Sequence, residues 1–245
     1  MRVWRHTLIA MVGWCAGAAA AQMPSPTEFE RAVTDARPEA LALGLQLRTD
    51  ALWLRMLQAQ TPMMASLGPG TCHIGYTAYN PRADFSTLFP ALSPADRAAW
   101  LGGFIRHELA HCADMQDTPV TTVAAIEASN LGHESGPWSE VLADLAFALH
   151  VDRHAAQGGL LIERLAALRA ERAGADPSHD SSLALRCYLA QRDSASPISG
   201  DWLATLRAWR TLCLPGERIA EAAKSTDQRL QRSQSVSSPH PVALR

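Results

Sequence analysis

The chain has 245 residues, of which 47% are hydrophobic, and a formal net charge of −2 with a pI near 6.5. A charge so close to neutral gives no reason to expect nucleic acid or an anionic membrane surface as a partner. The length and hydrophobic content fit one folded domain with a sizeable core, which we place at residues 22–223.

The first 21 residues are predicted to form a secretory signal peptide. Two arginines precede an apolar run over residues 8–21, and three alanines before Gln22 satisfy the small-residue rule for cleavage. The run is shorter than the roughly 20 residues that cross a bilayer, so no stable membrane anchor is expected after cleavage. Bulky Trp14 before Cys15 argues against a lipoprotein site. The mature chain is therefore expected to be exported, and its alanine and arginine richness favours a bacterial periplasm.

Two helices are predicted near the start of the mature chain. Residues 25–28 form a capping box with a proline in the first turn, so the first helix is expected to run to about Asp35. A second is predicted after Pro38, to about Gln60. Both are expected to pack behind the functional site.

Residues 71–80 form the only stretch with strand character, being rich in Thr, Tyr and Ile and closed by Asn80-Pro81. Alternation along a strand puts two sets of side chains on opposite faces: Cys72, Ile74 and Tyr76 on one, and His73, Thr77 and Tyr79 on the other. We therefore predict a mainly α chain with one small β element, of the α+β class.

The sequence His107-Glu108-Leu109-Ala110-His111 is the strongest functional signal. Ser93 and the following Pro94 predict a helix start, so the motif lies about three turns into a helix. The two histidines face the same side, where both imidazoles can hold one Zn²⁺ while Glu108 reaches its water. Trp100 and Phe104 continue the same stripe, so this face is expected to pack inward. A pair of buried, hydrogen-bonded histidines is the alternative interpretation.

A catalytic zinc normally takes three protein ligands, so a third donor is needed. Glu140 is the best candidate, because Asp144 shares its face of a predicted helix that continues to about Val151. Apolar residues on the other faces make both carboxylates costly to bury without partners. We expect Glu140 to bind the metal and Asp144 to accept the free ring N–H of a ligating histidine.

Three other residues compete for the role of third ligand. Asp114 follows His111 by three residues on the same helix, where an acid more readily caps or solvates the helix end. His133 and Glu134 lie in a glycine-containing loop over residues 130–137, and a flexible loop is a poor place for a metal ligand.

These residues resemble the gluzincin group of zinc metallopeptidases, in which H-E-x-x-H is followed by an E-x-x-A-D type sequence on a second helix. The match covers roughly residues 70–155. It implies a zincin-like domain in which Asp144 hydrogen-bonds the first histidine, His107. It also implies that residues 71–80 are the edge strand that pairs with an extended substrate. A metzincin is not indicated, because no third histidine follows soon after His111.

Four cysteines remain in the mature chain, and in an exported protein they indicate two disulfides with three possible pairings. The order along the chain favours Cys72 with Cys112 and Cys187 with Cys213. Further helices are predicted over residues 158–172, 179–191, 201–211 and 215–224, with arginine-rich outer faces. The tail from residue 224 to 245 lacks an apolar face and is expected to be disordered.

The expected function is that of an exported metallopeptidase with one Zn²⁺ per chain, a protein or peptide substrate and Glu108 as general base. The group that stabilises the oxyanion is left open among four candidates: Tyr76, Tyr79, His73 and His179. Two other functions stay open, namely a non-catalytic exported zinc-binding or interaction module and a zinc amidase that acts on cell-wall peptide.

Overall fold

The computed structural model describes residues 23–49, 62–76, 88–117, 137–174, 180–194 and 201–214. Within these residues the chain is mainly α-helical with one three-stranded sheet, which confirms the predicted α+β class at that level. The predicted signal peptide, the helix at 215–224 and the tail to residue 245 lie outside the described residues.

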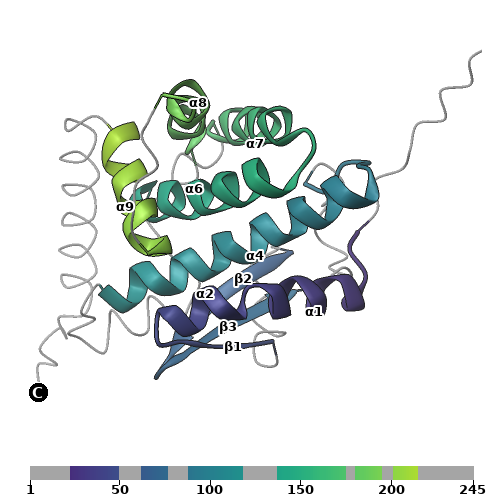
Figure 1. Ribbon diagram of the computed structural model, residues 1–245, viewed down its shortest axis with the longest axis vertical. Helices are drawn as coiled ribbons and strands as arrows, with labels where there is room; N and C mark the ends of the chain where they lie inside the picture. Colours follow the sequence, from purple (N-terminus) through teal and green to yellow (C-terminus); the bar gives the residue numbers. More distant parts are fainter. Residues whose placement is uncertain are drawn as a thin grey trace, which may run out of the picture.

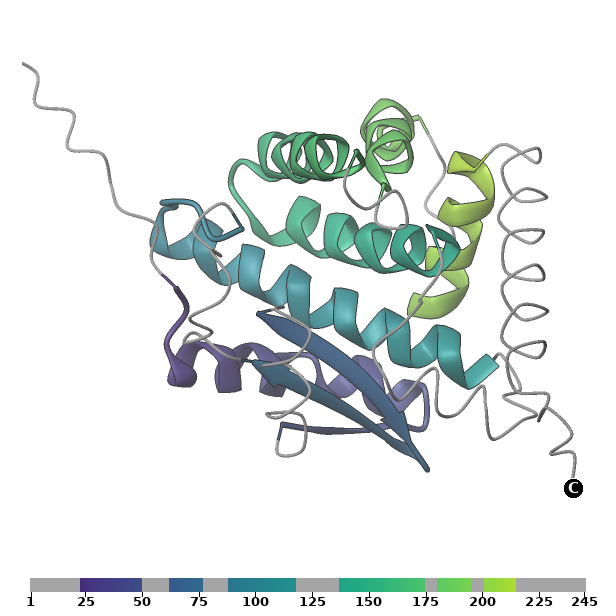
Figure 2. The ribbon, with the colours of Figure 1, turned by 180° about the vertical axis from the view of Figure 1, so that it is seen from behind.

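The long helix α4 (Pro94–Asp117) runs through the middle of the molecule (Figures 1 and 2). On one side it packs along α6 (Pro137–His154), and on the other it contacts the sheet and α1 (Pro26–Asp35). Three further helices pack around α6: α7 (Gly158–Arg172), α8 (Ser182–Gln191) and α9 (Trp202–Cys213). Helix α4 is therefore the element that joins the helical layer to the sheet layer.

The predicted starts of α1 and α4 are confirmed by their caps. The Ser25 hydroxyl accepts a hydrogen bond from the Glu28 amide, and the Glu28 carboxylate accepts one from the Ser25 amide. At α4, the Ser93 hydroxyl accepts from the Asp96 amide at 3.1 Å. These contacts satisfy amide groups that a helix start would otherwise leave without partners.

Strand β3 (Thr71–Tyr76) lies between β1 (Gln46–Arg48) and β2 (Met63–Gly68) in the sheet. It pairs with β1 in parallel and with β2 in antiparallel fashion. The turn that joins β2 to β3 has Pro69 followed by Gly70 at φ +62°, a left-handed conformation that glycine adopts without a steric penalty.

The helix predicted from Pro38 to Gln60 is wrong over residues 43–49. Helix α2 (Arg37–Ala42) ends before Gly44, whose φ of +72° cannot continue a right-handed helix. Residues 46–48 then form β1 against β3. The tertiary pairing overrides the local helical spacing, and residues 50–61 lie outside the described part of the chain.

Two expectations about residues 71–80 are also corrected. They are not the only strand, because β1 and β2 flank them, and β3 is the central strand rather than the edge strand that the family resemblance implied. Residues 63–68 contain none of the β-branched or aromatic residues that are enriched in strands, so we attribute β2 chiefly to its pairing with β3. Residues 77–80 lie outside the described residues.

The predicted alternation along β3 holds where the structure describes it. Cys72 and Ile74 are fully buried against the helical layer. The Tyr76 ring stacks on Phe29 of α1 with centroids 5.0 Å apart. His73 occupies the alternate position, opposite Ser66 of β2.

Aromatic side chains fill the contact between α4 and α6. Trp100 and Phe104 of α4 meet Phe147 of α6, each with ring centroids 4.9 Å from it. The Trp100 indole N–H donates to the carbonyl of Leu88 at 2.9 Å. The stripe predicted from Trp100 to His111 therefore does face inward. None of the described helices has the length and apolar character needed to span a bilayer.

Candidate metal centre

His107 and His111 of α4 meet Glu140 of α6 between the two helices. The two Nε2 atoms are 3.1 Å apart. One Glu140 oxygen lies 3.3 Å from Nε2 of His111, and the other lies 3.7 Å from Nε2 of His107. All three residues are buried, with exposed fractions of 6%, 8% and 3%. They form a group that could hold a metal ion.

The spacing of these donor atoms fits a small, four-coordinate cation. Bonds of about 2.0–2.1 Å at tetrahedral angles put neighbouring donors roughly 3.3–3.4 Å apart. The two Nε2 atoms are 3.1 Å apart, and they lie 3.3 and 3.7 Å from the two different oxygens of Glu140, so the separations are close to that value but involve both carboxylate oxygens. Among the described residues the group consists of two imidazoles and one carboxylate, a set of three ligands like that of catalytic sites, where the fourth position is taken by water.

The second nitrogen of each histidine has a buried partner on α6. Nδ1 of His107 lies 2.8 Å from a carboxylate oxygen of Asp144, as the family resemblance implied. Nδ1 of His111 lies 3.1 Å from the hydroxyl of Ser139, a contact that sequence reasoning missed. A histidine whose Nδ1–H donates to such a group presents the lone pair of Nε2 to a metal.

Asp144 receives further donors from outside α4 and α6. Nε and a terminal nitrogen of Arg169 on α7 donate to its two oxygens at 2.7 and 2.8 Å. The hydroxyl of Ser181, just before α8, also donates to it. Sequence reasoning missed both residues and assigned the arginines of α7 to an outer face. In the structure only 12% of the Arg169 side chain is exposed.

Burial and charge shift the pKa values of the central groups in opposite directions. Burial alone would raise the pKa of Glu140, but His111, and then His107 and Arg169, hold it well below its usual range. Burial alone would lower the pKa of His111, but the charge and hydrogen bond of Glu140 raise it to about 9. Without a metal, the pair therefore behaves as an imidazolium and a carboxylate at neutral pH.

Glu108 lies between the two histidines in sequence and is also buried, with 7% exposed. Burial raises the pKa of its carboxyl group, more than His107 and His111 lower it. A carboxylate with a raised pKa is a better proton acceptor, which is the property that a general base needs.

A pair of glycines permits the close approach of α4 and α6. A Cβ atom at Gly102 would lie 2.5 Å from Nε2 of His150, and one at Gly103 would lie 2.7 Å from the Phe147 ring. Both distances are too short for a larger residue unless the facing side chain or its helix shifts. No role was predicted for these glycines from the sequence, although a glycine pair within a helix can indicate close packing.

Of the four candidates for oxyanion stabilisation, the structure describes Tyr76 and His73. The single hydroxyl proton of Tyr76 is donated to the carbonyl of Pro24 at 2.6 Å, next to α1. His73 lies on β3 beside the β2 strand. Tyr79 and His179 lie outside the described residues. The role therefore stays open among the four candidates.

Of the three competing third ligands, the structure describes only Asp114, which is not part of the group. Asp114 accepts a hydrogen bond from Arg210 of α9 at 3.1 Å, so its carboxylate ties the end of α4 to the last described helix. His133 and Glu134 lie outside the described residues.

Two disulfides have the pairing that the chain order favoured, and one of them is next to the site. Cys72 of β3 joins Cys112 of α4, which follows His111 directly, and Cys187 of α8 joins Cys213 of α9. Two disulfides in one chain are typical of proteins that fold outside the cytoplasm.

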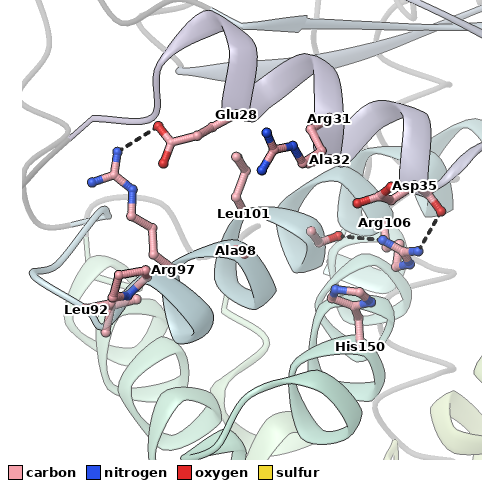
Figure 3. A pocket seen from close by; sticks show the side chains of 12 residues that line it. Glu28, Arg31, Ala32, Asp35, Leu92, Arg97, Ala98, Leu101, Arg106 and His150 are labelled. Atoms are coloured by element: carbon pink, nitrogen blue, oxygen red, sulfur yellow. Dashed lines mark hydrogen bonds and ion pairs between the residues drawn. The ribbon is translucent and has the colours of Figure 1, made fainter.

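A cavity of about 370 Å³ lies between α1, α4 and the end of α6, apart from the metal ligands (Figure 3). Arg97 and Glu28 pair across one part of it, and Arg106 donates to the Asp35 carbonyl in another. Burial, and then the charge of Arg106, lower the pKa of His150 to about 3, so this imidazole is neutral. The polar groups Arg97, Glu28 and Arg106 around the cavity therefore have partners within the protein.

The chain matches no protein-family model, no curated protein and no solved structure. What the geometry defines is a mainly α-helical protein with a buried His–His–Glu group that could hold a metal ion.

Proposed function

We propose that this chain is an exported zinc metallopeptidase whose metal is held by His107, His111 and Glu140. The observation that carries the proposal is the convergence of these three buried side chains, whose donor atoms all lie within 4.8 Å of one another. Glu108 follows the first histidine directly in the sequence. The gluzincin-like order of the motifs supports the same assignment.

Zinc is the metal that this donor set fits best. Two imidazoles and one carboxylate form the His₂Glu set of several catalytic zinc sites, and Zn²⁺ has no strong geometric demand beyond four near neighbours. Calcium and magnesium prefer six or more oxygen ligands, which a group with two imidazole nitrogens does not supply. One ion per chain follows from the single group of this kind in the described residues.

When bound, Zn²⁺ polarises a carbonyl group and lowers the pKa of water. Glu108 accepts a proton from the attacking water and delivers it to the leaving amine. Asp144 and Ser139 keep the two imidazoles oriented, so that neither ring turns during the reaction. Burial among apolar residues of α4 and α6 limits the access of bulk water.

We propose a protein or peptide substrate and a bacterial periplasmic location. The two disulfides support a compartment outside the cytoplasm. The near-neutral charge supports neither nucleic acid nor an anionic membrane surface as partner.

The test compares wild type with Glu108→Gln, with Glu163→Gln as a control at an exposed glutamate of α7. All three proteins are expected to bind one Zn²⁺ by elemental analysis. Glu108→Gln is expected to cleave a broad peptide mixture at least about 100-fold more slowly, because it lacks the base. Equal rates for wild type and Glu108→Gln would refute the proposed mechanism.

A second candidate is a non-catalytic zinc-binding module, which the burial of the site favours. The three ligands and Glu108 are each less than one-tenth exposed. Wild type that binds zinc but cleaves no peptide would support this candidate. To test the third alternative, the same assay offers purified peptidoglycan beside an unfolded protein. Cleavage of the cell-wall peptide alone would show that the enzyme is a zinc amidase and not a peptidase.

A further inference from the structure

We propose that Arg169 of α7 is a positioning residue of the metal centre, which fixes the ring of His107 through Asp144 and balances the charge of the carboxylates around the ion. This inference rests on the proposed metal site and extends it to a third helix.

The contact between Arg169 and Asp144 is two-pronged. Nε of Arg169 lies 2.7 Å from one carboxylate oxygen, and a terminal nitrogen lies 2.8 Å from the other. A guanidinium is planar and rigid, so this geometry fixes the plane of the carboxylate as well as its position. Asp144 is completely buried, so no water competes for its oxygens.

Each Asp144 oxygen therefore accepts two hydrogen bonds. One oxygen accepts from Nδ1 of His107 and from Arg169, and the other accepts from Arg169 and from Ser181. A carboxylate held in this way cannot rotate to follow a moving imidazole. The ring of His107 is thus kept with Nδ1–H toward Asp144 and Nε2 toward the shared point with His111 and Glu140.

The charge of Arg169 completes the balance of the buried group. Glu108, Glu140 and Asp144 carry three formal negative charges, whereas a divalent ion supplies only two positive ones. Arg169 supplies the third, and its guanidinium is also 3.5 Å from a Glu140 oxygen. A buried site strongly disfavours net charge, so the arginine makes this set of acids compatible with one divalent ion.

The experiment measures zinc affinity by competition with a chromogenic chelator and records the visible absorption of the Co²⁺-loaded protein. It compares wild type with Arg169→Gln, Arg169→Lys and the control Arg186→Gln. Arg186 forms an exposed ion pair with Glu163 across the same α7–α8 contact. The control therefore removes an arginine from this contact without touching the metal centre.

Arg169→Gln is expected to bind Zn²⁺ about 10- to 100-fold more weakly and to show a changed Co²⁺ spectrum, as when an outer partner of a ligand is lost. Arg169→Lys keeps the charge but loses the two-pronged contact, so an intermediate affinity is expected. Arg186→Gln is expected to match wild type in both measurements.

Ser181→Ala provides a milder variant in case Arg169→Gln does not fold. It removes one hydrogen bond from Asp144 and is expected to weaken zinc binding, but less than Arg169→Gln does. Folded Arg169 and Ser181 variants with wild-type affinity and an unchanged Co²⁺ spectrum would overturn the inference and leave the proposed function intact. Wild type that binds no metal would instead overturn the proposed function itself.

Discussion

Gly103 of α4 and Phe147 of α6 lie so close together that a Cβ atom at Gly103 would be 2.7 Å from the phenyl ring. The contact is one helical turn from His107 and one turn from Asp144. The separation of the two helices at this point therefore sets whether the ligands on α4 reach the carboxylates on α6. The glycine is part of what builds the site, although it offers no ligand.

Gly103→Ala is expected to destabilise the protein and to weaken zinc binding. Overpacking in a core typically costs about 1–3 kcal/mol, whereas the better helix propensity of alanine returns at most about 1 kcal/mol. If alanine returns about 1 kcal/mol, the net loss expected in denaturant unfolding is up to about 2 kcal/mol. A second substitution, Phe147→Leu, removes the clash and is expected to restore part of the zinc affinity.

Gly159→Ala is the matched control, because a Cβ there meets only the end of the flexible Arg192 side chain, at 3.0 Å. Its stability and zinc affinity are expected to stay at the wild-type level. If Gly103→Ala and Gly159→Ala have the same stability and zinc affinity, the packing of α4 against α6 does not depend on a glycine at position 103.

Ser139→Ala is expected to lower zinc affinity without a large loss of stability. The hydroxyl lies 3.1 Å from Nδ1 of His111, so its removal frees the ring to turn. We expect about a 10-fold weaker affinity, and a stability loss near 1 kcal/mol from one hydrogen bond. Ser182→Ala removes another buried hydroxyl, one that donates to Asp180, and is expected to leave zinc binding unchanged.

The two disulfides are expected to differ in their effect on the site. The chain separations of 40 and 26 residues correspond to about 4 and 3.5 kcal/mol of stability in the loop-entropy model. Only the Cys72–Cys112 bridge is next to His111. Replacing that pair by alanine is expected to reduce both stability and zinc affinity, whereas replacing Cys187 and Cys213 is expected to reduce stability alone. Titration of both variants with Zn²⁺ shows whether only the loss of the Cys72–Cys112 bridge lowers zinc affinity.

The raised pKa of His111 predicts a pH-dependent stability in the metal-free protein. Because the pKa rises from 6.5 to about 9 on folding, chiefly through Glu140 acting against burial, the protonated imidazole stabilises the folded state. This contribution is fully present below about pH 6.5 and is lost as the pH rises through about 9.

The measurement compares the unfolding free energies of wild type and His111→Gln in chelator between about pH 6 and pH 10. The extra stability of wild type over the variant is expected to shrink as the pH rises through about 9, because titratable groups away from His111 contribute equally to both proteins. A constant difference would contradict the assigned pairing of His111 with Glu140.

The parts of the fold and site that could be predicted depend on contacts between residues close in sequence. Ser25 and Ser93 cap their helices across three residues, and the spacing of His107 and His111 puts them on one helix face whatever the tertiary fold. The same holds for Glu140 and Asp144, whose burial was predicted from their apolar neighbours.

The parts that could not be predicted depend on partners far along the chain. Residues 46–48 form a strand because β3 lies beside them, and nothing in their own sequence requires it. Arg169 does follow Leu165 and Ala166 on the buried stripe of α7, so its burial could have been noticed. The identity of its acid partner, 25 residues away, could not.

The central claim is that two imidazoles of α4 and one carboxylate of α6 bind a single zinc ion. X-ray absorption of the zinc-loaded protein, with elemental analysis of wild type and Glu140→Gln, tests it most directly. We predict one Zn²⁺ per chain with two histidine ligands, oxygen or nitrogen neighbours at about 2.0–2.1 Å and no sulfur. A much lower zinc content is expected in Glu140→Gln. Sulfur in the coordination shell, or a Glu140→Gln protein that retains zinc as tightly as wild type, would contradict the account.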